Sequence, residues 1–316
     1  IQIVYGEPAC YGIVSQSKHV RRGINEYLDG YLPDDNVRFR SYAIKFTQAP
    51  KIAELSPEVK FSFPKLIKSF QNFKVEIQPG SVHKGELLGV MGANGLGKTT
   101  FLKLLAGELS PDEGDVEKIR IAYKPQYLTS QIQGTVEDNL KQEAGSLYNS
   151  GWYKLNILEK LGIKRILQNE VSRLSGGELQ KFHIAITLSK EDIDLVAMDE
   201  PSAFIDVEDR LAVAEIIKEF ITKKEIAGIV VDHDIQFIDF LSDRILVFEG
   251  IPAKEGKVFG PLSKREGMNR VLMNLDITYR RDKETLRPRI NKPNSQLDKE
   301  QRMKGCLLYT SPSPRD

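Results

Sequence analysis

The stretch GANGLGKT (residues 92–99) combines glycines with a lysine and a threonine at a spacing that suits phosphate binding. It follows an apolar segment with strand character and precedes a segment whose apolar residues recur at helical spacing. Glycines let successive backbone N–H groups converge on one phosphate, and a helix N-terminus adds partial positive charge. Lys98 is expected to place its charge on the β- and γ-phosphates, and the Thr99 hydroxyl to ligate Mg²⁺. The residues predicted to contact the nucleotide are Gly92, Asn94, Gly95, Gly97, Lys98, Thr99 and Thr100.

A second apolar segment, DLVAMDE (194–200), ends in two carboxylates. If this strand lies beside the phosphate loop, Asp199 is suited to the shell of Mg²⁺ and Glu200 to polarising the attacking water. The phosphate loop favours this interpretation over that of two solvated acids at the end of a strand. The sequence therefore predicts a site for nucleotide hydrolysis.

Two further polar residues follow segments with strand character. Gln126 follows IAYKP (121–125), where its amide is placed to ligate Mg²⁺ or the water; by itself it would be a polar loop residue. His233 follows GIVVD (228–232) and suits a hydrogen bond near the γ-phosphate, although a lone histidine is more often a core or surface residue. We predict Glu200, His233 and Gln126 as the catalytic residues, and Thr99, Gln126 and Asp199 as the ligands of Mg²⁺.

A serine and two glycines in RLSGGELQKF (173–182) form a second potential phosphate cradle at the start of a helix. The order of the phosphate loop, Gln126, LSGGELQ, MDEPSAFID and VVDHD resembles that of ATP-binding-cassette (ABC) ATPases over about residues 60–262. In that family, ATP lies on the phosphate loop of one cassette and is capped by the signature sequence of another. The resemblance implies that Ser175, Gly176, Gly177 and Glu178 contact ATP held by a partner cassette.

The resemblance also implies the fold: an α/β P-loop NTPase of ABC type, with a mixed sheet flanked by helices, a helical signature subdomain (about 128–190) and hinge segments. An aromatic residue upstream of the phosphate loop is expected to stack on adenine. Phe70 has the expected offset, and Phe73 looks like a core-facing residue of the next strand, although the two could be exchanged. Core packing of both rings is the alternative.

The flanking segments 4–40 and 267–301 are atypical of transporter cassettes and resemble ABC subfamily E, the ribosome-recycling ATPases also called RNase L inhibitors. In that family, a single chain carries an iron–sulfur domain, two cassettes and hinges. We therefore expect this chain to be the C-terminal half of such a protein. The expected parts are the end of a first cassette (1–19), a hinge (20–42), the second cassette (43–262) and a second, basic hinge (263–304).

Some residues depart from these patterns. Lys181 and His183 follow the signature where an arginine and a small apolar residue are more usual, and we expect altered packing rather than lost function. The last stretch, 305–316, resembles translated adaptor or vector sequence, so we expect a non-native tail outside the fold.

The composition excludes several classes of protein. The mean hydropathy is −0.33, and no stretch approaches the roughly 18 apolar residues of a membrane span. Cys10 and Cys306 are the only cysteines, which excludes a disulfide framework and fits a cytoplasmic location. Lys and Arg outnumber Asp and Glu by 12 to 6 in residues 264–304, so this segment either meets a polyanion such as RNA or is ordinary solvated surface.

These observations predict one cassette of a soluble twin-cassette ATPase that splits or recycles ribosomes, with ATP-driven closure acting as a clamp. ATP and Mg²⁺ are the expected cofactors, and hydrolysis by this chain alone is expected to be inefficient. The expected partners are the small ribosomal subunit, ribosomal RNA, a first ABC cassette and translation release factors, with no membrane. The main alternative is the ATPase subunit of a membrane ABC transporter, and a second is a nucleotide-gated scaffold. The basic residues weighed as RNA contacts, or as partners of hinge carboxylates, are Arg270, Arg280, Arg281, Arg287 and Arg289.

Overall fold

The structure, a computed structural model, describes residues 1–6, 11–40, 43–44, 56–281 and 288–309. Contacts between Cα atoms divide the chain into two compact units. The larger unit comprises Ala49–Arg280 with Ile290–Thr310, and the smaller comprises Ile1–Gln48 with Arg281–Arg289 and Ser311–Asp316. The boundaries that we expected between remnant, hinges and cassette stay predictions.

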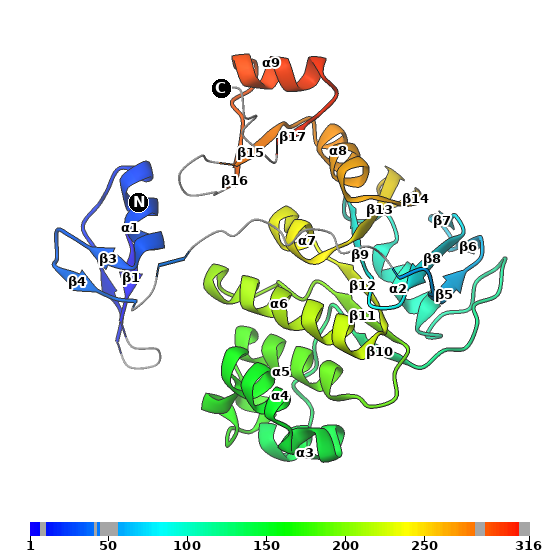
Figure 1. The fold of residues 1–316 in the computed structure, drawn as a ribbon, viewed down its shortest axis with the longest axis horizontal. Coiled ribbons are helices and arrows are strands. Elements are labelled where there is room, and N and C mark those ends of the chain that lie inside the picture. The colour runs from blue at the N-terminus through cyan, green and yellow to red at the C-terminus, as the bar shows by residue number, and fades with distance from the viewer. Residues whose placement is uncertain (7–10, 41–42, 45–55, 282–287, 310–316) are drawn as a thin grey trace. The chain divides into compact units, whose positions relative to one another are not determined.

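An eight-stranded mixed sheet forms the centre of the larger unit (Figure 1). Its order is β10-β11-β12-β9-β13-β14-β7-β6. Strands β10, β11, β12, β9 and β13 run parallel to one another, whereas the pairs β13–β14 and β6–β7 are antiparallel. The carboxyl ends of the parallel strands therefore share one edge, where ligands of open α/β sheets bind. The strands span Leu66–Ser69 (β6), Lys74–Ile77 (β7), Leu87–Gly92 (β9), Ile121–Lys124 (β10), Leu195–Asp199 (β11), Ala227–Val231 (β12), Arg244–Ile251 (β13) and Glu255–Ser263 (β14).

Each central strand is buried on both faces, which explains the apolar runs in the sequence. On β11, Leu195 and Ala197 join one hydrophobic cluster, while Val196 and Met198 join the other. Helix α2 (Lys98–Leu105) packs in the first cluster, and α5 (Gly176–Ser189), α6 (Val207–Lys224) and α7 (Ile235–Leu241) pack in the second (Figure 1). Helices thus cover both faces of the sheet, as predicted.

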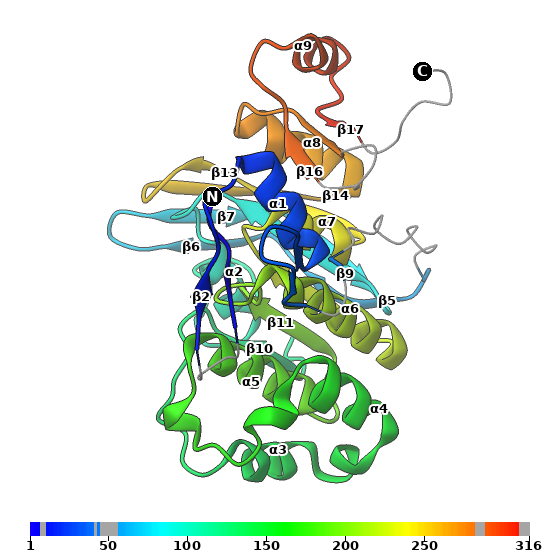
Figure 2. The same cartoon turned by 90° about the vertical axis from the view of Figure 1, so that its left-hand side faces the viewer.

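The stretch between β10 and β11 is helical and gathers at one end of the larger unit (Figure 2). It leads into the signature helix, α5. Its packed interior includes Leu140, Tyr153 and Phe182, all fully buried. The helices before α5 span Val136–Ala144 (α3), Gly145–Asn149 (η1), Gly151–Tyr153 (α4), Lys154–Lys160 (η2), Ile163–Ile166 (η3) and Val171–Arg173 (η4).

Beyond the main sheet, the larger unit contains β5 (Val59–Phe63), which pairs antiparallel with β8 (Gly80–His83). After β14 come α8 (Lys264–Asn274), β15 (Tyr279–Arg281), β16 (Pro288–Ile290), α9 (Gln296–Met303) and β17 (Leu308–Tyr309). Leu307 is buried, and its backbone N–H donates to Asn269 Oδ1 over 3.1 Å. The fold therefore continues past residue 304, where we expected it to end; residues 310–316 lie outside the described part, and the non-native origin of the tail stays a prediction.

The smaller unit contains two short antiparallel pairs and one helix. The pairs are β1 (Val4–Tyr5) with β2 (Ile13–Val14) and β3 (Tyr31–Leu32) with β4 (Val37–Arg38), and the helix is α1 (Val20–Asp29). The Lys18 ammonium is almost completely buried and bridges the carboxylates of Glu26, at 3.0 Å, and Asp34, at 2.5 Å. This bridge ties α1 to the β3–β4 turn.

Candidate active site

The phosphate loop runs from the end of β9 to the start of α2, and its glycines are required by its geometry. Gly92, Gly95 and Gly97 have φ values of +152°, +76° and +95°, in the region that side chains disfavour. A Cβ atom on Gly92 would lie 2.5 Å from the carbonyl oxygen of Phe248, and one on Gly97 would lie 3.0 Å from the Phe73 ring. The loop can therefore keep its backbone amides open to a ligand only with glycine at these positions.

Lys98, the first residue of α2, folds back over this loop. Its Nζ donates to the carbonyl oxygens of Gly92, over 2.8 Å, and Ala93, over 2.7 Å. Burial lowers the pKa of Lys98 to about 8, and the nearby carboxylates of Glu200 and Asp199 oppose this shift. A largely buried cation at a helix N-terminus, beside open amides, suits a polyphosphate.

The residues expected to hold Mg²⁺ meet between α2 and β11. Thr99 Oγ1 donates to Asp199 Oδ2 over 2.6 Å, so the two expected oxygen ligands already lie side by side. Burial raises the pKa of Asp199, an effect that a bound cation would counteract. Gln126 follows β10 and lines the same cavity. A hydroxyl, a carboxylate and an amide are the oxygen donors that suit Mg²⁺, so these residues fit the ion.

Glu200 lies at the centre of the polar groups on this edge of the sheet. Its Oε1 accepts from Gln126 Nε2 over 2.9 Å and lies 3.0 Å from His233 Nε2. The backbone of Glu200 is left-handed, with φ of +48°, and its N–H donates to Val231 C=O over 2.8 Å. The structure thus brings together the three residues that we predicted to be catalytic.

A cavity of about 520 Å³ opens over these groups. It is lined by Phe73, Asn94, Gly95, Gly97, Lys98, Thr99, Thr100, Gln126, Tyr127, Asp199, Glu200, His233 and Ala253. Phe73, Tyr127 and Ala253 were not among the predicted contacts. Only the neighbouring phosphate-loop and glutamine motifs could have indicated Phe73 and Tyr127, and nothing in the sequence indicated Ala253.

Phe70 is not among the residues that line this cavity; it lies on its neighbour Phe73. The ring centroids are 6.3 Å apart and the planes 29° apart. Phe70 is 46% exposed, whereas Phe73 is half-buried against the core and lines the cavity. The stacking of adenine on Phe70 stays a prediction, and the exchange of the two rings gains support from this geometry.

The signature residues lie at the N-terminus of α5 and do not line this cavity. Ser175 caps the helix: its Oγ accepts from Glu178 N–H over 3.4 Å, and the Glu178 carboxylate accepts from Ser175 N–H over 2.9 Å. Ser175 and Gly176 are exposed, and a Cβ on Gly177 would lie 2.8 Å from the carbonyl oxygen of Phe204. The capping box therefore presents open backbone amides away from the chain's own phosphate loop.

The two atypical residues of α5 have defined partners. Lys181 forms an ion pair with Asp209 on α6. His183 Nε2 lies 3.0 Å from the carbonyl oxygen of Thr129, and burial lowers the pKa of this imidazole. Both residues thus contribute packing contacts to the signature helix.

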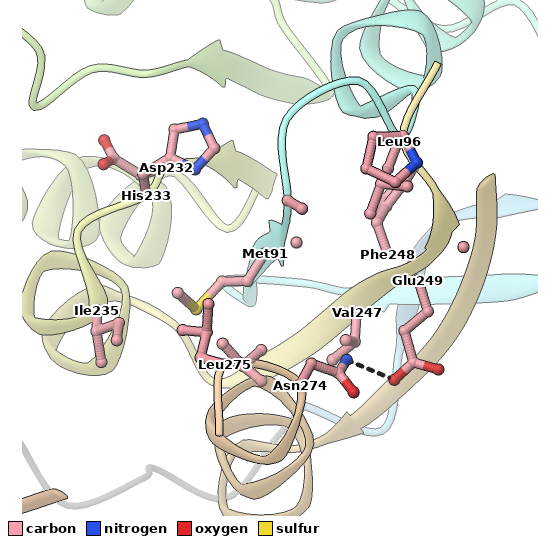
Figure 3. Close-up of a pocket in the computed structure, with 15 residues that line it drawn as sticks. Met91, Leu96, Asp232, His233, Ile235, Val247, Phe248, Glu249, Asn274 and Leu275 are labelled. Atoms are coloured by element: carbon pink, nitrogen blue, oxygen red, sulfur yellow. Dashed lines mark hydrogen bonds between the residues drawn. The ribbon is translucent and has the colours of Figure 1, made fainter. Parts of the chain in front are cut away.

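A second cavity, of about 440 Å³, lies behind the phosphate loop (Figure 3). It shares Gly92 and His233 with the machinery described above, and α8 contributes Asn274 to its wall. Asn274 Nδ2 donates to Glu249 Oε1 over 2.8 Å, and Arg270 Nε donates to the same oxygen over 2.5 Å (Figure 3). The C-terminal segment is therefore bonded to β13 beside the phosphate loop.

Comparison with known proteins identifies the family. A model described as ABC transporter matches residues 78–203. ABC transporter E family member 3 of Arabidopsis thaliana is 31% identical over 170 residues, which are 52% of this chain and 93% of that protein. The chain belongs to the E family of ABC proteins.

Longer relatives agree with membership of the E family. An uncharacterized ABC transporter ATP-binding protein of Methanocaldococcus jannaschii is 47% identical over 312 residues, or 98% of this chain and 52% of that protein. Translation initiation factor RLI1 of Saccharomyces cerevisiae is 40% identical over 311 residues, with shares of 97% and 51%. The chain thus spans about half the length of these curated relatives.

Solved structures of the E family have the same fold. A structure titled RNase-L Inhibitor is 48% identical, with a TM-score of 0.88, and the match covers 98% of this chain and 60% of that one. ABCE1 in a model of ribosome-bound archaeal Pelota and ABCE1 is 47% identical, with a TM-score of 0.90 and shares of 98% and 52%. The predicted family and the predicted ABC-type fold are confirmed. No helix in the described part of the chain is long and apolar enough to cross a membrane.

Proposed function

We propose that this E family cassette binds and hydrolyses ATP at the edge of its sheet. One observation carries the proposal: Glu200 is held by Gln126 and His233 in the cavity that Lys98 and the phosphate loop line. A carboxylate in that position can orient a water molecule and accept its proton. Lys98 and the loop amides bind the phosphates, and His233 holds the carboxylate in place.

Thr99, Asp199 and Gln126 are proposed to hold Mg²⁺. The ion, when bound, neutralises charge on the phosphates. Gln126 has a double role in this arrangement, because its amide oxygen is free to face the ion while its nitrogen donates to Glu200. Asn94 and Thr100 line the cavity beside the loop and supply further polar contacts.

Ser175, Gly176, Gly177 and Glu178 are proposed to cap ATP held by another cassette. Their position at an exposed helix N-terminus, outside the lining of the chain's own cavity, supports this role. ATP would then close two cassettes like a clamp, and hydrolysis would reopen them. This chain alone is expected to turn over ATP slowly, because its own nucleotide lacks a facing signature.

Ribosome recycling in the cytoplasm is the proposed biological setting. The titles of solved relatives support it: one describes an archaeal ribosome recycling factor, aABCE1, with ribosomal stalk protein aP1, at 48% identity, a TM-score of 0.87, and 98% of this chain and 60% of that chain covered. We propose the small ribosomal subunit, its RNA, a first cassette and release factors as partners. Transporter cassettes match at 20–21% identity and share the fold alone.

The C-terminal arginines divide into two groups. Arg270 is paired with Glu249 and stacks on Phe259, with its guanidinium carbon 3.9 Å from the ring centroid, so it braces α8 against β13. Arg280 is exposed and remains the better candidate for a phosphate contact. Arg281, Arg287 and Arg289 are not assigned to either group, because the side chain of Arg281 and all of Arg287 lie outside the described residues and Arg289 has a partner of its own.

The hydrolytic role is tested with Glu200→Gln, using Glu215→Gln on the exposed face of α6 as the matched control. Glu200→Gln is expected to keep affinity for ATP and to lower turnover about 100-fold or more. Glu215→Gln is expected to match the unmodified chain. Equal turnover in all three proteins would remove Glu200 from the proposed role.

The biological setting has a separate test. Co-sedimentation with small ribosomal subunits is measured with a non-hydrolysable ATP analogue across a salt series. Binding that weakens with salt and survives competitor RNA is the expected result. Absence of binding by the chain, and again after the first cassette is restored, would contradict the ribosomal proposal.

A further inference from the structure

Two buried side chains from different elements hold consecutive backbone carbonyls of the acid pair. Lys124 Nζ, on β10, donates to the Asp199 carbonyl oxygen over 2.9 Å. Gln180 Nε2, on α5, donates to the Glu200 carbonyl oxygen over 2.6 Å. Lys124 and Gln180 are each only 1% exposed. Neither side chain lines the cavity, so both act on the backbone from behind it.

The backbone at Glu200 needs such support. Its φ of +48° lies in the left-handed region, which a residue with a long side chain occupies only when its surroundings enforce it. The Glu200 N–H is bonded to Val231, and the Glu200 carbonyl also accepts a longer bond from Ala203 N–H, at 3.3 Å. The shorter bond from Gln180 is therefore the main restraint on this carbonyl from outside the turn.

Gln180 also belongs to the signature helix. It lies five residues after Ser175, or about 7.5 Å along the helix axis. Three residues further on, His183 contacts the Thr129 carbonyl in the loop that follows Gln126. One face of α5 is thus bonded to the backbones on both sides of the cavity.

We propose that Gln180 is a positioning residue, which fixes Glu200 for hydrolysis by tying its carbonyl to the signature helix. The inference rests on the proposed ATPase function of Glu200. Its consequence is that a displacement of the signature, which caps the nucleotide of another cassette, changes the orientation of Glu200 in the same chain.

The test compares Gln180→Met with Thr187→Val, a matched control on the same helix. Thr187 is 3% exposed, and its hydroxyl donates to His183 C=O over 2.7 Å, so each variant removes one buried hydrogen bond of α5 at nearly constant volume. Hydrogen–deuterium exchange on the nucleotide-free chain reports opening of the backbone at Glu200–Ala203. Turnover is measured at several chain concentrations, together with binding of a fluorescent ATP analogue.

Gln180→Met is expected to speed exchange at Glu200–Ala203 about tenfold and to lower kcat by a similar factor. Affinity for the analogue is expected to stay the same, because the phosphate loop is unchanged. Thr187→Val is expected to lower the melting temperature similarly and to leave both exchange at this turn and kcat unchanged.

Equal exchange at Glu200–Ala203 in the two variants would overturn the inference, as would an equal kcat. If Gln180→Met does not fold, Gln180→Glu keeps the size but sets a carboxylate against the carbonyl, and unchanged exchange in that variant would also overturn it. Failure of the proposed function gives a different result: Glu200→Gln then hydrolyses ATP at the unmodified rate, while the exchange difference between Gln180→Met and Thr187→Val persists.

Discussion

Asp232 accepts two hydrogen bonds from Ser202, one from the backbone N–H over 3.0 Å and one from Oγ over 2.8 Å. Its Oδ1 also accepts from Asp234 N–H over 2.9 Å. Asp232 is 2% exposed, so these donors replace the water that its carboxyl group would otherwise bind. The turn that follows Glu200 is thereby bonded to the loop that carries His233.

Ser202→Ala removes one of these bonds and leaves the buried Asp232 carboxyl group short of a donor. We expect the free energy of unfolding to fall by about 1–3 kcal/mol. Turnover is also expected to fall, because the His233 loop loses an anchor. Thermal unfolding and ATPase assays check both effects against Ser172→Ala, a substitution at an exposed serine. A stability equal to that of the control would contradict the prediction.

Phe70 and Phe73 are expected to differ in what they bind. If Phe70 stacks on adenine, Phe70→Ala weakens ATP binding about tenfold and leaves binding of inorganic triphosphate unchanged. Phe73→Ala removes a ring that a Cβ atom on Gly97 would contact at 3.0 Å, so it is expected to lower the melting temperature more. Titration with both ligands separates the roles. A loss of ATP affinity confined to Phe73→Ala would exchange them.

Gly92→Ala tests the packing of the phosphate loop, with Gly107→Ala as the control. Both glycines have positive φ, but a Cβ on Gly107 meets nothing within 4 Å, whereas one on Gly92 meets the Phe248 carbonyl. We expect Gly107→Ala to cost about 1–2 kcal/mol of stability. Gly92→Ala should cost about 2 kcal/mol more through steric overlap and also lose ATP affinity. Denaturant unfolding measures the difference, and equal costs would refute the clash.

Asp194 provides a pH-dependent test remote from the cavity. Hydrogen bonds from Arg120 and Lys60 hold the pKa of this carboxyl well below its ordinary value. Because the folded-state pKa is the lower one, the stabilisation is complete above about pH 4, the unfolded value, and is lost as the pH falls toward the folded value.

Asp194→Asn is accordingly expected to lower stability by about 1 kcal/mol at pH 7 and progressively less below about pH 4. The melting temperatures of the two proteins, measured from pH 7 to pH 3, should converge. A difference that is constant across this range would mean that ionisation of Asp194 is not its cause.

Much of the site follows from local sequence. The phosphate loop needs glycines at Gly92, Gly95 and Gly97 because a short turn between strand and helix imposes positive φ, whatever surrounds it. Asp199 and His233 follow apolar strands, and the carboxyl ends of parallel strands share one edge of a sheet. These features depend on residues near each other in the chain, so the pattern of residue types was sufficient to predict them.

Only the tertiary structure determined which distant groups meet. The contacts of Gln180 with Glu200, of Lys124 with Asp199 and of His183 with Thr129 join residues of separate elements through single hydrogen bonds. The place of Phe73 in the cavity wall and the packing of Leu307 likewise depend on neighbours far away in sequence. A hydrogen bond or a packed ring depends on distances of a few ångströms between elements, and residue types along one chain do not specify those distances.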